Sequence, residues 1–286
     1  MKILVTGANG QLGSEFRLLS LIYDNFIWVF TGINELDLID FKNLNNNLSK
    51  INPDLIINCA AYTNVDKAES EEKLANLLNF KAVDLLSKWT SNNKSKIIHI
   101  STDYVFDGNS SISLKEDAFT SPINIYGKSK LKGEKACQKN DLNCIIIRTS
   151  WVYSTFGKNF VKTMSSLMKK KDTLNIVNDQ IGSPTYARDL AETITNIINY
   201  KDWLPGLYHY SNEGEVSWFD FAKSIKKNYG YSTSLNSIST DEYPTPAKRP
   251  SYSLLDTSKI KTTFNIKVPS YESSLEKCIK ILKNEK

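Results

Sequence analysis

The sequence predicts an α/β fold, a doubly wound, Rossmann-like parallel sheet with a smaller C-terminal α/β lobe. Short apolar runs alternate with longer helical patterns through the first half, a glycine-rich turn follows the first run, and this rhythm breaks after about residue 150. Continuous apolar runs separated by helices are typical of parallel strands that are covered on both faces. We therefore expect a first unit at 1–149 and a lobe at 150–286, some of whose segments return to the main sheet.

The elements follow from these patterns in order. Strands are expected at residues 3–5, 26–30, 55–59, 97–101 and 144–148, with helices at 12–21, 71–87 and 128–139 between them. Beyond 150 we expect a strand at 173–177, a loop at 178–185 and a helix at 188–198. Six of the eight prolines lie beyond residue 180, which favours a less regular lobe. Ligands of such a sheet bind at the carboxyl ends of its strands.

Composition excludes several classes of protein. The mean hydropathy is −0.35 and no apolar run approaches 18 residues, so we expect no membrane span. The first residues look like a strand rather than a signal segment, so we expect a cytoplasmic protein. The 36 basic and 31 acidic residues are mixed, which suits a small anionic ligand but forms no stripe for nucleic acid. The four cysteines are scattered and predict neither a disulfide framework nor a zinc site.

The glycine turn predicts a dinucleotide cofactor. Gly7, Gly10 and Gly13 follow the first strand and open a helix, so the backbone can approach a diphosphate and the helix start can bind it. The acid that commonly ends the second strand is absent, because Gly32 and Ile33 stand there. Asp37 is the nearest acid, and it either faces the adenosine end or caps the next turn. The choice between NADH and NADPH is therefore open.

Tyr126 and Lys130 predict a site of proton delivery. They are four residues apart on an expected helix, so their side chains lie side by side. A neighbouring ammonium should lower the tyrosine pKa toward neutrality, where a general acid is most effective. Thr102 ends an expected strand and can hold a substrate oxygen against Tyr126. The alternative is structural, with the tyrosine at the edge of the core and the lysine in water.

Several longer motifs resemble one family. Residues 58–69, 101–108, 148–153, 179–185, 206–209, 217–218 and 245–250 are similar, in the same order, to segments of the dTDP-4-dehydrorhamnose reductase family within the extended short-chain dehydrogenase/reductase superfamily. The resemblance covers nearly the whole chain. It implies a dinucleotide-binding first unit, a substrate-binding second lobe, and NAD(P)H-dependent reduction of the C4 ketone of dTDP-4-dehydro-L-rhamnose.

The resemblance also implies roles for individual residues. Tyr126 would be the catalytic acid, Lys130 would tune it and bind the nicotinamide ribose, and Thr102 would hold the C4 oxygen. The other implied cofactor-binding residues are Gly7, Gly10, Gln11, Leu12, Gly13, Asp37, Leu38, Ala60, Ala61, Tyr62 and Thr63. The implied sugar pocket adds Asp103, Tyr104 and Trp151, although aromatic residues beside strand ends are more often core. Arg249 would pair with the nucleotide diphosphate or face water.

Three alternatives to this function stay open. The chain could act on another nucleotide-linked deoxyhexulose as a reductase or an epimerase, or be a non-catalytic NADP-binding subunit like the methionine adenosyltransferase β-subunit.

Some members of the family bind magnesium through glutamates, and Glu15 fits one such position. Arg188 and Asp189 stand where a second glutamate would fall, so we expect no metal. The expected partner is a nucleotide sugar, without nucleic acid or membrane, and a homodimer is the assembly considered.

Overall fold

The centre of the molecule is a six-stranded parallel sheet. The computed structural model describes residues 1–284, and the sheet order is β10-β5-β4-β3-β1-β2. The pairs that join neighbouring strands are all parallel. The strands are β1 (Lys2–Thr6), β2 (Ile27–Thr31), β3 (Leu55–Asn58), β4 (Lys96–Thr102), β5 (Ile145–Thr149) and β10 (Gly206–His209).

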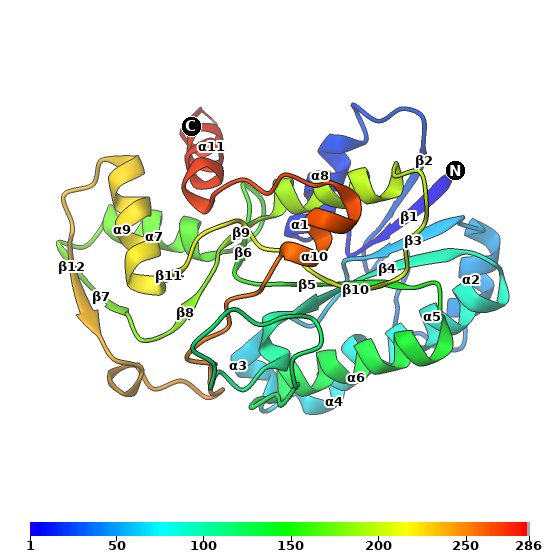
Figure 1. Cartoon of the computed structure of the whole chain (residues 1–286), viewed down its shortest axis with the longest axis horizontal. Helices are drawn as coiled ribbons and strands as arrows, with labels where there is room; N and C mark the ends of the chain where they lie inside the picture. The colour runs from blue at the N-terminus through cyan, green and yellow to red at the C-terminus, as the bar shows by residue number, and fades with distance from the viewer. Residues whose placement is uncertain (285–286) are drawn as a thin grey trace.

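Helices cover both faces of this sheet, as Figure 1 shows. On one face α1 (Gln11–Leu19), α8 (Ala187–Ile198) and α10 (Ser258–Phe264) enclose a core that contains Phe16, Leu190 and Ile260. On the other face α2 (Leu44–Ile51), α5 (Ala82–Asn92) and α6 (Ile125–Asn140) enclose a second core that contains Leu44, Leu86 and Cys137. These two cores make the sheet doubly wound, as the sequence predicts.

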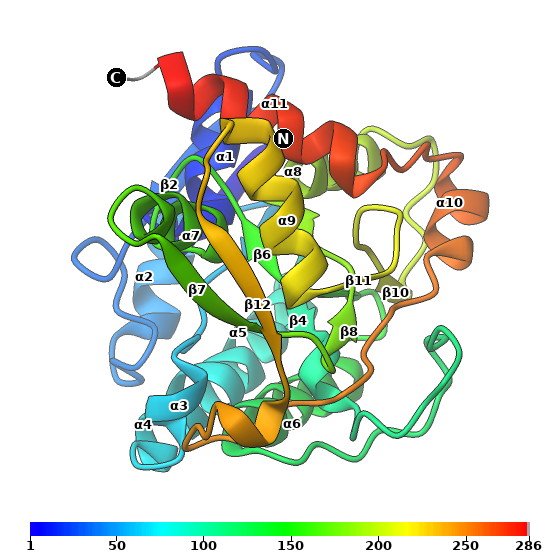
Figure 2. The ribbon, with the colours of Figure 1, turned by 90° about the vertical axis from the view of Figure 1, so that its left-hand side faces the viewer.

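A smaller lobe lies beyond the carboxyl ends of the sheet and has its own core, centred on Phe221. Figure 2 views it from its outer side, where the paired strands β7 and β12 run beside α9. Its elements are α7 (Phe160–Met168), β7 (Thr173–Val177), β11 (Val216–Ser217), α9 (Trp218–Tyr229), β12 (Ser234–Ile238) and α11 (Tyr271–Asn284). The remaining elements are short: α3 (Val65–Ala68), α4 (Glu72–Asn76), η1 (Leu77–Lys81), η2 (Asp103–Val105), β6 (Val152–Tyr153), β8 (Ile181–Gly182), β9 (Thr185–Tyr186) and η3 (Thr240–Glu242).

The expected strands are confirmed within two residues at each end, and β7 is found at its expected bounds. Two expectations are wrong in detail. The helix expected at 71–87 is divided into α4, the π-helical turn η1 and α5, which runs on to Asn92. The loop expected at 178–185 contains β8 and part of β9, because each short strand pairs with a segment distant in sequence.

The second half of the chain contributes to the main sheet as well as to the small lobe. Strand β10 pairs with β5, and α8 packs against α1. The division at residue 150 therefore stays a prediction. The two units are interleaved along the chain, because segments from both sides of residue 150 build the main sheet and its helical layers.

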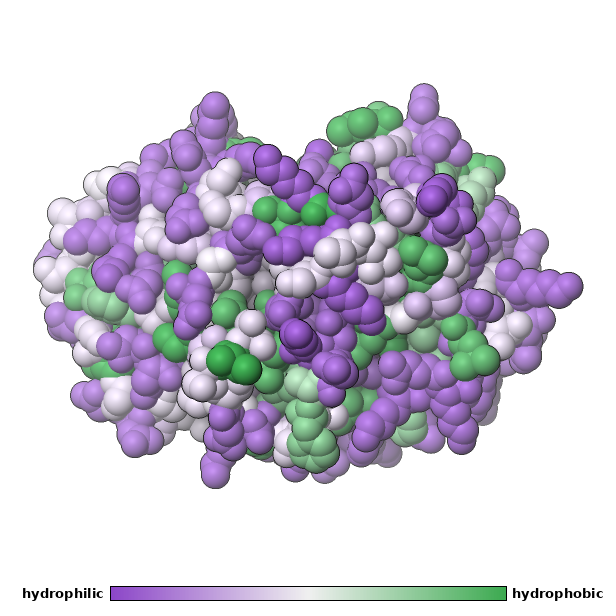
Figure 3. All heavy atoms as spheres, viewed as in Figure 1, coloured by the Kyte–Doolittle hydropathy of each residue, from purple (hydrophilic) through white to green (hydrophobic). Residues whose placement is uncertain are grey.

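Hydrophilic side chains cover most of the face seen in Figure 3, with hydrophobic ones in small separate groups. Within residues 1–284, no helix has the length and apolar character needed to cross a bilayer.

Candidate active site

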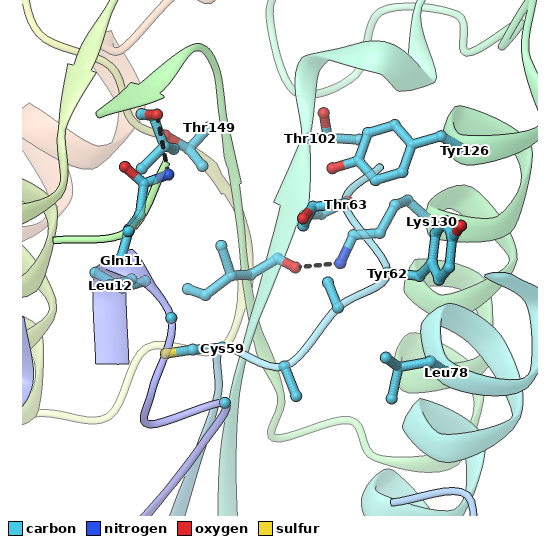
Figure 4. A pocket seen from close by; sticks show the side chains of 18 of the residues that line it. Gln11, Leu12, Cys59, Tyr62, Thr63, Leu78, Thr102, Tyr126, Lys130 and Thr149 are labelled. Atoms are coloured by element: carbon cyan, nitrogen blue, oxygen red, sulfur yellow. Dashed lines mark hydrogen bonds between the residues drawn. The ribbon is translucent and has the colours of Figure 1, made fainter. Parts of the chain in front are cut away.

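A cavity of about 910 Å³ opens at the carboxyl ends of the central strands. Parallel pairing aligns Thr6 with Asn58 and Thr102 with Thr149, so the loops after these strands meet at one edge. That edge is where an open α/β sheet binds its ligands. The volume is within the range of small-molecule and cofactor sites. Figure 4 shows side chains from several of these loops facing one another across the cavity.

The glycine turn lies at the base of the cavity. Gly7 has φ +63° and passes so close to β3 that an added Cβ would lie 2.6 Å from the Ala60 nitrogen. Gly10 is the N-cap of α1 and has no side chain to bond the N–H groups of the first turn. These groups suit a diphosphate, and Gly10, Gln11 and Leu12 line the cavity. Gly13 lies behind them, where it allows the helix to pack against the Gly7–Ala8 backbone.

The segment after β3 forms the next wall. Ala60, Ala61, Tyr62 and Thr63 all line the cavity. The amide of Asn79, in the π-helical turn η1, accepts a hydrogen bond from the Tyr62 nitrogen at 2.8 Å and donates to the Tyr62 carbonyl at 3.1 Å. The π-helical turn therefore fixes the backbone of a cavity wall, which is a common use of such turns.

Asp37 and Leu38 line the end of the cavity near β2, together with Leu36 and Ile39. The Asp37 carboxylate accepts a hydrogen bond from the Ile39 nitrogen at 3.0 Å. It thus caps its own turn and also lines the cavity, which is compatible with both of the roles expected for it. The surrounding leucine and isoleucine side chains make this end apolar, as a planar base requires.

Thr102, Tyr126 and Lys130 come together on one wall (Figure 4). The Lys130 ammonium is buried and donates to the Ile100 carbonyl at 2.6 Å. Desolvation lowers the pKa of Lys130 to about 8, against the opposing effect of the Glu134 carboxylate. Desolvation raises the pKa of Tyr126 to about 12, and its hydrogen bond with Thr102 acts in the opposite direction.

The expected fall in the Tyr126 pKa is therefore wrong for this state of the protein. Lys130 lies one helical turn from Tyr126, but its ammonium donates a hydrogen bond to the Ile100 carbonyl of β4. Burial of the Tyr126 phenol is the largest influence on its pKa, and burial raises it. The phenol is consequently protonated throughout the neutral range, which is the form that a proton donor needs.

Asp103 and Tyr104 follow Thr102 and also line the cavity. The Asp103 carboxylate accepts hydrogen bonds from Thr102 at 3.1 Å and from Ser253 at 2.6 Å. Burial nonetheless raises the pKa of Asp103 to about 6. The Tyr104 ring meets the Tyr126 ring edge-on, with centroids 5.7 Å apart.

Trp151 also lines the cavity and stacks on Trp218 with ring centroids 3.6 Å apart. Its backbone has φ +48°, which is uncommon for a large side chain and marks a strained position. Gly182 packs on the Trp151 indole, where an added Cβ would lie 3.0 Å from the ring. The indole therefore occupies one orientation at the mouth of the small lobe.

Arg249 is a candidate for binding the nucleotide diphosphate, but its guanidinium contacts other parts of the protein instead. Its guanidinium forms an ion pair with Asp66 at 2.8 Å and donates to the Ala247 carbonyl at 2.9 Å. It is not among the residues that line the cavity. These bonds tie the proline-rich loop to α3, and they hold the pKa of the Asp66 carboxyl below its usual value.

Comparison with known proteins shows the family of this chain. The family model described as the RmlD substrate binding domain matches residues 1–284. The chain belongs to this family. It is 40% identical over 290 residues to the dTDP-4-dehydrorhamnose reductase of Salmonella typhimurium, covering 98% of this chain and 97% of that one.

Solved structures of two relatives are also similar to this RmlD-family chain. A dTDP-4-dehydrorhamnose reductase from Clostridium acetobutylicum has a TM-score of 0.94 at 38% identity and covers 99% of this chain and 100% of its own. A reductase of the same name from Bacillus anthracis, in complex with NADP, has a TM-score of 0.94 at 37% identity, with coverage of 98% and 99%.

The residues around Glu15 do not fit a metal ion in this RmlD-family chain. The buried Glu15 carboxylate accepts from the Ser154 hydroxyl at 2.6 Å, and the Arg188 guanidinium lies 3.7 Å away. A guanidinium beside the carboxylate disfavours a second cation. Within residues 1–284 no group of three or more His, Cys, Asp or Glu side chains is placed to hold a metal.

Some cavity residues were missed by reasoning from the sequence. They are chiefly apolar or lie on distant loops: Ile33, Val65, Leu74, Leu78, Gly157, Lys158 and Trp218. Val65 and Trp218 belong to motifs that contributed to the resemblance, so their place in the site could have been expected. The others carry no motif, and only the fold brings them to the cavity.

Proposed function

We propose that this chain is an NAD(P)H-dependent dTDP-4-dehydrorhamnose reductase, which reduces the C4 ketone of dTDP-4-dehydro-L-rhamnose to dTDP-L-rhamnose for nucleotide-sugar synthesis. The observation that carries the proposal is that Thr102, Tyr126 and Lys130 share one cavity with the glycine turn. The 40% identity to a reductase of that name, over 98% of the chain, supports the choice of substrate.

Tyr126 acts as the proton donor. NADH or NADPH, when bound, supplies the hydride that C4 receives. The Tyr126 phenol transfers its proton to the C4 oxygen, so the carbonyl becomes a secondary alcohol and the tyrosine a phenolate. Thr102 hydrogen-bonds the same oxygen and keeps it within reach of the phenol. Solvent then returns the proton to Tyr126.

Lys130 supports this step by charge and position. Its ammonium is one helical turn from Tyr126, and a positive charge in a buried site stabilises the phenolate that forms. The same ammonium can hold the nicotinamide ribose. Because of the i, i+4 spacing, the single side chain of Lys130 can act on both the Tyr126 phenol and the cofactor ribose.

The walls of the cavity suit a deoxysugar. Trp151 and Trp218 present stacked apolar rings, against which a sugar that carries a methyl group in place of a hydroxymethyl can pack. Asp103 and Tyr104 also present polar atoms to the cavity, and these can bind the remaining hydroxyls.

An assay of cofactor oxidation tests this function. Oxidation of NADH and NADPH is followed with dTDP-4-dehydro-L-rhamnose and, in parallel, with GDP- and UDP-linked 4-ketosugars. We expect stoichiometric cofactor consumption with the dTDP sugar and formation of dTDP-L-rhamnose. An epimerase would interconvert sugars without net consumption, and a binding subunit would turn over none of them; either result would reject the proposal.

Two finer expectations are proposals as well. We propose that the chain acts in the cytoplasm and that it forms a homodimer. Fractionation of cells that express the tagged protein tests the first, and light scattering coupled to size exclusion tests the second.

A further inference from the structure

Few charged side chains face the cavity. Among the described residues that line it, two are acidic, Asp37 and Asp103, and two are basic, Lys130 and Lys158. The buried Lys130 ammonium donates to the Ile100 carbonyl, on the wall of the proton donor. Lys158 is therefore the basic side chain of the cavity that the proposed chemistry does not use.

The segment that carries Lys158 lies between β6 and α7, and side chains bond it to α1 near both of its ends. Near its start, the Ser154 hydroxyl donates to the Glu15 carboxylate at 2.6 Å. At its end, the Asn159 amide donates to the Gln11 side-chain oxygen at 3.0 Å. These two bonds hold the segment against the first turns of α1, which the glycine turn opens.

Gly157 brings the backbone of this segment close to the start of α1. It has φ +64°, and a Cβ on it would lie 3.2 Å from the Gln11 Cγ. Gln11 is the first residue of α1, so Lys158 comes directly after a point where the segment meets the helix start. The N–H groups of that helix start are the ones that suit a diphosphate.

The Lys158 side chain is exposed while it also lines the cavity. Within residues 1–284, neither an ion pair nor a hydrogen bond engages its ammonium. A lysine ammonium is a point charge on a flexible stem, and it forms charge-assisted hydrogen bonds with phosphate oxygens. The ammonium is thus available to a phosphate group that enters the cavity beside α1.

We propose that Lys158 is a further cofactor-binding residue, whose ammonium pairs with the diphosphate of NADH or NADPH at the start of α1. The glycine turn offers this group N–H dipoles, and Lys158 adds a full positive charge. The inference rests on the proposed function only for the class of cofactor. It does not depend on which sugar is reduced.

Isothermal titration calorimetry on the full chain tests this pairing without any ketosugar. NADH, NADPH and ADP-ribose carry the diphosphate in question, whereas dTDP, titrated into the cofactor-saturated protein, reports on the diphosphate of the substrate. Lys158→Met removes the charge and keeps a long side chain, and Lys158→Arg keeps the charge. Lys170→Met is the matched control, because Lys170 is exposed beyond the other end of α7 and does not line the cavity.

We expect Lys158→Met to bind NADH, NADPH and ADP-ribose about tenfold more weakly than the wild type at low salt, as the loss of one charge-assisted bond implies. That factor should fall toward one at about 0.5 M salt, because salt screens exposed charges. Lys158→Arg and Lys170→Met should bind the three ligands as the wild type does. The affinity for dTDP should be the same in every variant.

Unchanged cofactor affinity in Lys158→Met would overturn the inference. An equal loss in Lys158→Arg would also overturn it and trace the effect to packing, and an equal loss in Lys170→Met would trace it to overall charge. A loss confined to dTDP would overturn it by assigning the ammonium to the diphosphate of the substrate.

The outcome is separable from that of the proposed function, since the titrations involve no reduction. If no nucleotide sugar is reduced but Lys158→Met weakens ADP-ribose binding as expected, the cofactor inference stands and the substrate assignment fails. If the dTDP sugar is reduced and Lys158→Met binds every cofactor as the wild type does, the reverse holds.

Discussion

The hydroxyl of Tyr126 is the group on which the proposed chemistry depends. Tyr126→Phe removes the proton donor but keeps the ring that meets Tyr104 edge-on. We expect turnover to fall by about 10²–10⁴-fold while the affinity for NADH is unchanged, as steady-state rates and cofactor titration will measure. Tyr231→Phe is the matched control, because its hydroxyl bonds Ser165 in the small lobe, away from the cavity. Full activity in Tyr126→Phe would contradict the role.

The charge on Lys130 predicts an alkaline limit to activity. Because burial lowers the pKa of Lys130 to about 8, the ammonium is lost above that pH, and kcat/KM should fall as the pH rises through about 8. The native state then releases this proton before the unfolded chain does, so the contribution of Lys130 to stability rises between about pH 8 and pH 10.5. A fall in activity without any fall in the melting temperature is therefore expected, and an activity profile that stays flat to pH 9.5 would contradict it.

Among single residues, the sequence identifies those site residues that belong to a motif and does not identify those that lie outside one. Tyr126 and Lys130 are four apart on a helix, and Thr102 ends a strand, so elementary geometry already brings them to one edge of the sheet. For Arg249 the sequence offers either the nucleotide diphosphate or water as a partner, because its ion pair with Asp66, 183 residues away, cannot be seen in the sequence.

The helix that carries Tyr126 is held to the sheet by a buried ion pair. Glu134 on α6 accepts two hydrogen bonds from Arg148 on β5, at 2.9 and 2.8 Å, and Ser101 on β4 donates to the same carboxylate. Both charged side chains are at most 4% exposed. Gly127 on the same helix packs against the Tyr104 carbonyl, where a Cβ would overlap the oxygen. These contacts fix where α6 presents its catalytic face.

Removing one member of this pair should destabilise the protein strongly. Arg148→Ala leaves the Glu134 carboxylate buried without its partner, which costs about 3–5 kcal/mol in the free energy of unfolding. The double replacement Arg148→Met with Glu134→Leu should recover most of that loss, since no buried charge is left. Urea denaturation measures both, and a loss below about 1 kcal/mol in Arg148→Ala would show that the pair does not hold the helix.

Element positions were predictable where periodicity was strong. The strands of the main sheet are continuous apolar runs, which burial on both faces requires. The π-helical turn η1 was not predictable, because its cause is tertiary: Asn79 must reach both the Tyr62 backbone and Ser129 on α6. The short strands β8 and β9 could not be predicted either, because two residues are too few to show an alternation of apolar and polar side chains.

At the scale of the whole molecule, the cavity is shared between the two parts of the fold. Its walls include Gly7 and Ala60 from loops after strands of the main sheet, Tyr126 from helix α6, and Trp151 and Trp218 from the side of the small lobe. Because α8 and β10 from the second half pack on the main sheet, we propose that the two parts unfold together.

Cofactor binding should therefore raise the stability of the whole chain. A ligand at 100 times its Kd adds about 2.7 kcal/mol, which corresponds to a rise of about 4–5 °C in the melting temperature of a chain of this size. Scanning calorimetry with NADH should show one transition that moves upward as a unit. Two transitions, of which only one moves, would show that the lobes unfold independently.

The central claim is that hydride arrives at C4 of the sugar while Tyr126 protonates the oxygen. The most direct test uses NADH deuterated at C4 of the nicotinamide, in both stereochemical forms, with dTDP-4-dehydro-L-rhamnose. We predict that one form gives dTDP-L-rhamnose with one deuterium at C4, and that Tyr126→Phe binds the same cofactor but forms this product at least about a hundredfold more slowly. Product without deuterium from either form, or undiminished labelling by Tyr126→Phe, would contradict the account.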